Sequence, residues 1–201
     1  MGKNKKCWLA SISNVINKRL GLKHLWENQG STRVHFEIRK ITSNLQHIFE
    51  FQWHNALTKT NQDGTGNKLR TYNKFKSSFI KEAYLCQIRD YIARKNITRF
   101  RISAHHLRIE TGRYTRPVTL LQDRVCRSCN VIEDECHIIM DCKDLIYERN
   151  IMLNEVENTY AVFTDLSQYD KFIFIMRVGD FEMVQYVSKF LDSVAKKRGR
   201  I

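Results

Sequence analysis

Proline is almost absent from this sequence, with Pro117 the single one among 201 residues. Runs in which β-branched and polar residues alternate are also few. Because proline interrupts helices and alternation of this kind marks strands, both shortages favour helices. Hydrophobic residues make up 42% of the chain, which is enough to build one core and argues against wholesale disorder. We therefore predict a mainly α fold.

Long apolar runs are missing as well. No segment approaches the roughly 20 apolar residues that a bilayer-spanning helix needs, so no membrane partner is expected. The stretch Cys7 to Ile16 is too polar for the core of a signal peptide, and Lys6 breaks the myristoylation pattern. We predict an intracellular protein, nuclear or cytoplasmic, whose cysteines are reduced and therefore available to a metal.

Catalytic motifs are missing too. The sequence has no Asp-Asp pair of the kind that positions two metal ions in a polymerase, and no G-x-S-x-G elbow. The glycine-containing segment 64–68 lacks the spacing of a phosphate-binding P-loop. We therefore expect no enzymatic activity from this chain.

Charge is abundant but unevenly distributed. The formal net charge is +13, yet residues 1–120 carry 23 Lys and Arg against 7 Asp and Glu, whereas residues 121–201 carry 11 against 14. A basic half suggests a polyanionic partner, nucleic acid first, although a solvated basic face would look the same.

Helical spacing of apolar residues and a polar, glycine-containing loop at 61–67 divide the chain into four predicted segments. These are an N-terminal helical arm (1–60), a basic helical segment (61–118), a zinc-binding module (119–160) and C-terminal helices (161–201). The arm contains a long predicted helix at 33–58. Its candidate core residues are Phe36, Ile41, Leu45, Ile48, Phe49 and Trp53.

Four of the six cysteines crowd one short segment, and three of them join a histidine in the pattern C-x2-C-x7-H-x4-C. The pattern comprises Cys126, Cys129, His137 and Cys142. Two cysteines separated by two residues can hold one ion from a tight turn, and a second pair completes the tetrahedron that Zn²⁺ prefers. We predict one structural Zn²⁺ in a small C-x2-C…H-x4-C module attached to a helical bundle. Cys136 would point about 100° away from His137 on a helix and is the weaker ligand candidate.

Two alternatives stay open for this segment. The cysteines can be buried free thiols of a degenerate module. The metal loop can itself bind RNA, but residues 126–142 contain no aromatic residue for base stacking, and they carry four acids that repel phosphate. We favour a zinc ion that holds the fold together.

The stretch before the cysteines combines basic and aromatic residues: residues 68–116 contain 13 Lys and Arg against three acids. Arginine pairs with phosphates and stacks on bases. The predicted nucleic-acid contacts are Arg99, Arg101, Arg108, Arg113, Tyr114 and Arg116. The neighbouring pair His105 and His106 is expected to be structural or solvated rather than catalytic.

Several short motifs occur in a characteristic order. They are Leu25-Trp26-Glu27-Asn28-Gln29-Gly30, Tyr72-Asn73-Lys74-Phe75-Lys76, Arg99-Phe100-Arg101-Ile102-Ser103, Ile109-Glu110-Thr111-Gly112-Arg113-Tyr114, and the cysteine segment with Glu133-Asp134-Glu135 before His137. Over residues 20–160 this order resembles the C-terminal region of the endonuclease–reverse transcriptase polyproteins of non-LTR retrotransposons, downstream of the polymerase.

The resemblance implies a helical region that ends in a reverse-transcriptase-associated zinc-binding segment and helps to hold template RNA or target DNA. It implies the same four zinc ligands, a basic block at 99–114, and other domains of a retroelement polyprotein as possible partners. Without a polymerase motif, the chain looks like a detached or decayed copy of that region. The alternative hypothesis is a structural or protein-interaction domain with no nucleic-acid role.

Overall fold

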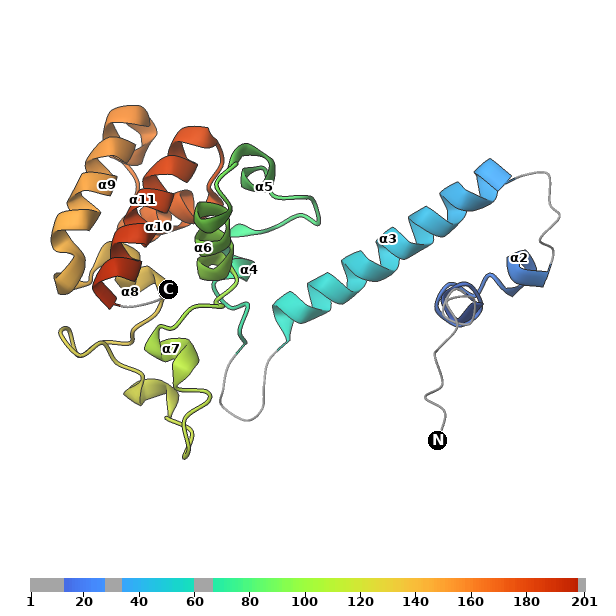
Figure 1. Cartoon of the computed structure of the whole chain (residues 1–201), viewed down its shortest axis with the longest axis horizontal. Coiled ribbons are helices and arrows are strands. Elements are labelled where there is room, and N and C mark those ends of the chain that lie inside the picture. Colours follow the sequence, from blue (N-terminus) through green and yellow to red (C-terminus); the bar gives the residue numbers. More distant parts are fainter. Residues whose placement is uncertain (1–12, 28–33, 60–66, 199–201) are drawn as a thin grey trace. The chain divides into compact units, whose positions relative to one another are not determined.

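The computed structural model describes residues 13–27, 34–59 and 67–198 (Figure 1). These residues are mainly helical and contain no strand, only an isolated antiparallel bridge between Val125 and Ile132. The prediction of a mainly α fold is confirmed. The chain forms two compact units, Met1–Asn55 and Ala56–Ile201. No helix in the described ranges is both long enough and apolar enough to cross a membrane.

In the first unit, a short π-helical turn, η1 (Val15–Arg19), contacts α2 (Lys23–Glu27). Leu20 and Leu22 are buried where these two elements meet. The part of the predicted arm before residue 13 lies outside the described residues.

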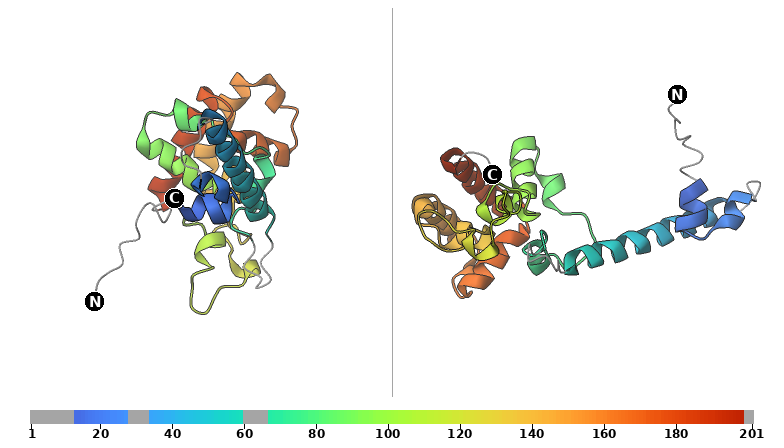
Figure 2. Two further views of the ribbon diagram at one scale, coloured as in Figure 1. Left: turned by 90° about the vertical axis from the view of Figure 1, so that its right-hand side faces the viewer. Right: turned by 90° about the horizontal axis from the view of Figure 1, so that it is seen from below.

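The long predicted helix is present as α3 (Val34–Thr58), a single continuous helix in the views of Figure 2. Leu57, near its end, is buried in the second unit, where the Asn67 side-chain amide donates to the backbone carbonyls of Ala56 and Leu57. The prediction that Phe49 is a core residue is wrong, since its side chain is 48% exposed. The side chain of Phe36 lies outside the described part of the chain.

The second unit is a bundle of short and medium helices. Its elements are α4 (Tyr72–Phe75), α5 (Tyr84–Gln87), α6 (Tyr91–Arg101), α7 (Arg108–Thr111), η2 (Leu121–Asp123), α8 (Glu135–Met140), η3 (Lys143–Leu145), α9 (Ile146–Thr159), η4 (Ala161–Phe163), α10 (Gln168–Arg177) and α11 (Phe181–Arg198). The helix α11 packs against both α9 and α6, and α9 and α11 lie side by side in Figures 1 and 2. The helix α10 packs against α4 and α8.

Polar side chains mark where several of these helices begin. Asp90 accepts a hydrogen bond from the Ile92 backbone N–H at the start of α6, and Ser167 accepts one from Asp170 at the start of α10. Such caps satisfy backbone donors that have no partner within the helix.

One hydrophobic core runs through the second unit. It includes fully buried residues from α6 (Ile97), α8 (Ile138), α10 (Ile175) and α11 (Leu191). The three segments predicted for residues 61–201 therefore share a single core, and the cysteine segment is packed into that core rather than appended to it.

Candidate metal centre

The first two cysteines sit on a tight turn that the backbone fixes. The Cys126 N–H donates to the Val131 carbonyl at 2.7 Å, and the Asn130 N–H donates back to the Cys126 carbonyl at 2.8 Å. Asn130 has φ 56°, a left-handed conformation that asparagine tolerates better than most residues. The turn places Cys126 and Cys129 on the same side of the chain.

The other two candidate ligands belong to the short helix that follows. Asp134 caps α8 by accepting a hydrogen bond from the His137 backbone N–H at 2.8 Å, as the acidic run before the histidine indicates. Two residues beyond the helix, the Cys142 N–H donates to the His137 carbonyl at 2.8 Å. This contact fixes Cys142 relative to His137.

The turn and the helix bring the four predicted ligands together. One ligand atom from each of Cys126, Cys129, His137 and Cys142 lies within 4.8 Å of the others. Three of these residues are buried, and Cys129 is half-buried. Cys136 is not part of the cluster, and burial raises the pKa of its thiol to about 11, so it stays protonated near neutral pH.

A metal ion fits this cluster for a reason beyond proximity. Both ring nitrogens of His137 are buried, and neither has a hydrogen-bond partner among the described residues. A buried polar atom without a partner costs free energy, and coordination to a metal ion would remove that cost for one nitrogen. The Lys143 backbone N–H already donates to the Cys129 Sγ at 3.3 Å, a contact that stabilises a thiolate. The cluster can therefore hold a metal ion.

Arg198, from the last turn of α11, closes the cluster. Its Nη2 lies 2.8 Å from the Cys142 Sγ and 3.6 Å from the Cys126 Sγ. The same guanidinium pairs with Glu133, and at 3.3 Å with Asp144. Three thiolates and a neutral imidazole around a divalent ion leave one excess negative charge, and Arg198 supplies the opposite charge beside it.

The two thiols that touch Arg198 differ in acidity. Burial disfavours ionisation of both. At Cys126 hydrogen bonding, led by that from Arg198, outweighs burial and lowers the pKa to about 6, whereas at Cys142 burial prevails and raises the pKa to about 12. Of these two thiols, Cys126 is therefore the one that ionises more readily.

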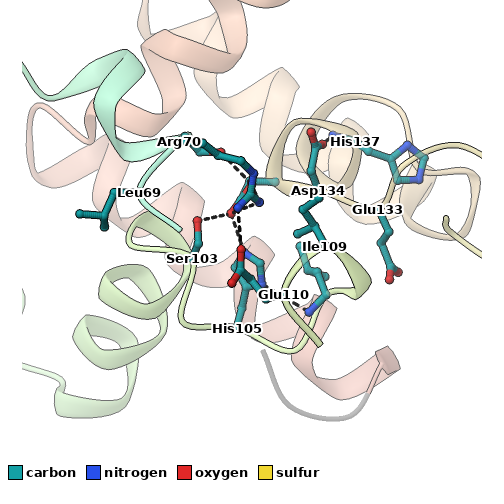
Figure 3. A network of polar contacts seen from close by, with 12 residues as sticks. Leu69, Arg70, Ser103, His105, Ile109, Glu110, Glu133, Asp134 and His137 are labelled. Carbon is teal, nitrogen blue, oxygen red and sulfur yellow. Dashed lines mark hydrogen bonds and ion pairs between the residues drawn. The ribbon is translucent and has the colours of Figure 1, made fainter. Parts of the chain in front are cut away.

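A network of buried polar groups lies behind the same helix. Glu135 is fully buried, and its carboxylate accepts hydrogen bonds from Ser103 at 2.5 Å and Thr71 at 2.8 Å. It also contacts His105 Nε2 at 2.7 Å and pairs with Arg70 at 3.0 Å. Figure 3 shows Arg70, Ser103 and His105 converging, with the His137 ring turned away from them.

The Glu135 network links segments far apart in the sequence. Arg70 also pairs with Glu110 at 2.5 Å, so one guanidinium bridges two buried carboxylates. Although burial opposes ionisation, His105 and Arg70 hold the pKa of Glu135 at about 2, so its charge persists at all ordinary pH values. The structural role expected for His105 agrees with this placement, and His106 is exposed.

Two of the predicted nucleic-acid contacts face the protein interior. Arg101 is 2% exposed, bonds to Glu82 at 3.0 Å and to the Arg177 carbonyl at 2.9 Å, and lies over the rings of Phe75 and Tyr84. The prediction that Arg101 contacts nucleic acid is wrong, because its guanidinium is buried and already bound by these groups.

Arg113 is the second of these residues. Its side chain is 9% exposed and pairs with Glu110 at 3.0 Å, so it too contributes little charge to the surface. The remaining four predicted contacts reach solvent. Tyr114 is 73% exposed, Arg116 is exposed, and Arg99 and Arg108 are half-buried. None of these three arginines forms an ion pair within the described ranges.

Sequence reasoning missed Arg124. This arginine is 1% exposed, and its guanidinium donates to the carbonyls of Ile109 and Thr119, each at 3.0 Å. Gly112 makes room for it, since a Cβ at that position would stand 2.7 Å from the Arg124 side chain. A glycine at position 112 together with an arginine at position 124 is the only sequence signal that could have indicated this buried arginine.

Arg124 and Arg198 both line a cavity of about 610 Å³ between the α7–η2 segment and the cysteine turn. Comparisons of this chain with protein-family models, with curated proteins and with solved structures found no match.

Proposed function

We propose that this chain is a noncatalytic nucleic-acid-binding module that a structural Zn²⁺ holds together. The observation that carries the proposal is a set of arginines, between α7 and the cysteine turn, that form no ion pair with a carboxylate within the described residues. Arg108, Arg116 and Arg127 belong to this set, and the exposed ring of Tyr114 lies in the same loop region. Arginine with an exposed aromatic ring is a combination that binds phosphates and stacks bases.

The pattern of ion pairs supports this proposal. Within the basic stretch 68–116, the cations that pair with acids are Arg70, Lys76, Arg101 and Arg113, and they lie toward the interior. The cations without such partners lie toward solvent, where they raise the local positive potential. A polyanion is the partner that such a surface attracts most strongly.

Zn²⁺ is the ion that the donor set favours. Three thiolates and one imidazole match the soft, tetrahedral preference of Zn²⁺, and four protein ligands leave no coordination position for a substrate or water. A closed site of this kind stabilises structure. The resemblance to the zinc-binding segment of retrotransposon polyproteins agrees with this assignment, and we propose that the chain is a counterpart of that region.

The test is a binding titration of the zinc-loaded full chain against labelled single-stranded RNA, single-stranded DNA and duplex DNA. We expect binding at low salt that weakens steeply as salt rises, because each phosphate contact releases counterions. Exchanging both Arg108 and Arg116 for Gln should weaken binding to all sequences and reduce the salt dependence. Arg177→Gln is the matched control, since Arg177 is exposed at the end of α10 and lies outside the basic stretch 68–116. Absence of binding to every probe at low salt would contradict the proposal.

A second candidate function, binding to another protein, is supported by a separate observation. The helix α3 exposes Ile38, Phe49 and Phe51, at 52%, 48% and 68%. Exposed apolar side chains of this size on one helix are typical of a surface that binds another protein. Self-association of the chain in sedimentation experiments, together with a failure to bind nucleic acid, would favour this protein-interaction role.

A further inference from the structure

The cavity beside the metal cluster contains a buried charge that the protein does not neutralise. Arg124 lines this cavity and forms no ion pair among the residues described. A guanidinium has five N–H donors, and the two contacts to backbone carbonyls use only part of them. A buried cation without a counter-ion is costly, and folded proteins seldom retain one without a partner.

The acids nearby do not supply that partner. Glu110 acts on Arg124 electrostatically, but its carboxylate is bonded to Arg70 and Arg113. Of the three acids that line the cavity, Glu133 and Asp144 are both paired with Arg198. Asp123, which is exposed, is the third.

The rim of the cavity adds further positive charge. Arg108 and Arg127 line it, and neither forms an ion pair within the described residues. Three arginines without carboxylate partners thus face one exposed carboxylate, that of Asp123. Thr111 and Thr115 also line the cavity, but their hydroxyls donate to the backbone carbonyls of Leu107 and Gly112, so the arginines are the donors that remain for an anion.

The position of Arg124 depends on glycine at residue 112. A side chain at Gly112 would collide with Arg124, because the Cβ would lie 2.7 to 2.8 Å from three of its atoms. Glycine leaves room for the side chain, and the hydrogen bonds to the Ile109 and Thr119 carbonyls hold the guanidinium in one position. A fixed donor group of this kind is preorganised for a ligand, which reduces the entropy lost on binding.

We propose that this cavity is a phosphate-binding site that takes one phosphodiester group and its sugar from a single-stranded nucleic acid. Arg124 contacts the phosphate at the base of the cavity, and Arg108 and Arg127 contact it from the rim. A volume of about 610 Å³ admits a single nucleotide unit but not a duplex. This inference rests on the proposed function and names the place where the nucleic acid enters.

The experiment compares the zinc-loaded full chain with Arg124→Gln, Arg127→Gln and the control Arg177→Gln. Binding of a labelled single-stranded RNA 12-mer is followed by fluorescence anisotropy, with zinc content and helicity measured for each variant. Loss of a charge-assisted contact should weaken binding about tenfold or more for Arg124→Gln and Arg127→Gln, and leave Arg177→Gln near the parent value. If Arg124→Gln fails to fold, Arg127→Gln carries the comparison, because its side chain is exposed.

The outcomes separate this inference from the proposed function. If the parent chain binds RNA and the cavity variants bind it equally well, the cavity assignment is overturned while the proposed function stands. If the parent chain binds no RNA, the proposed function fails. The melting temperature is then compared between pyrophosphate and sodium chloride at equal ionic strength, which tests whether the cavity still binds phosphate. A rise in melting temperature that Arg127→Gln abolishes supports a phosphate site, and equal melting temperatures refute it.

Discussion

The two sides of α8 differ in how their buried polar groups are satisfied. On one side, the carboxylate of Glu135 has partners from Arg70, Thr71, Ser103 and His105. On the other side, two residues along, both ring nitrogens of His137 lack a hydrogen-bond partner in the described part of the chain. The protein alone completes the first cluster, whereas the second leaves polar atoms that a metal ion could complete. A helix of six residues thus joins a polar cluster that is complete in itself to one that can hold a metal ion.

Removing the metal should have the largest effect on the stability of the second unit. We expect chelation of zinc, or the substitutions Cys129→Ser and His137→Ala, to destabilise the second unit by on the order of 10 kcal/mol, because metal binding in small sites is coupled to folding. Circular dichroism during titration with a chelator, with native mass spectrometry for metal content, measures the effect. Full helicity without metal would show that the cluster is as self-sufficient as the Glu135 network.

Glu135→Gln attacks the other side of the helix and should have the next largest effect. Loss of a buried charge that holds Arg70 and His105 should lower the free energy of unfolding by about 3 kcal/mol at neutral pH.

The effect of Glu135→Gln should also depend on pH. The pKa of Glu135 is lowered from 4.5 to about 2 on folding, so its contribution is complete above pH 4.5 and is lost as the pH falls toward 2. Denaturant unfolding of the parent and Glu135→Gln at several pH values checks this. A difference between them that stays constant over this range would contradict the assignment.

Arg198→Gln tests the metal side of α8 through its affinity for zinc. Without the guanidinium beside Cys126 and Cys142, zinc affinity should fall about 10- to 100-fold, as for other residues that support metal ligands. Competition with a chromogenic chelator gives the affinity. Lys196→Gln, in the same turn and paired only with Asp192, is the matched control and should bind zinc like the parent chain.

Cys136→Ala should have the smallest effect. Cys136 neighbours His137 but lies outside the cluster, so zinc stoichiometry and affinity should not change. Stability should fall by about 1 kcal/mol or less, since the side chain is only half-buried. Loss of zinc in this variant would make Cys136 a ligand and remove Cys129 or Cys142 from that role.

The features that sequence reasoning predicts best are local. Helix α3 and the cysteine turn follow from residues a few positions apart, and the cap of Asp134 on α8 follows from the acids before His137. Their physical causes, helical periodicity and the geometry of a short turn, act over that same distance.

The features that it misses depend on residues far apart. Arg198 lies 56 residues from Cys142, and Arg70 lies 65 residues from Glu135. No periodicity connects such pairs. Arg101 shows the converse error, because the sequence reveals its charge but not the half-buried Glu82 and the aromatic rings that contact its guanidinium.

The position of Arg198 has a practical consequence for dividing this protein into pieces. A fragment cut to the cysteine segment alone, such as 119–160, would lose the cation that faces two of the thiols and the helix that carries it. It would also expose the apolar surface that α9 shares with α11. The smallest piece expected to reproduce the metal centre extends from the turn before Arg70 through the last turn of α11, because the cysteine segment is packed into the bundle around it.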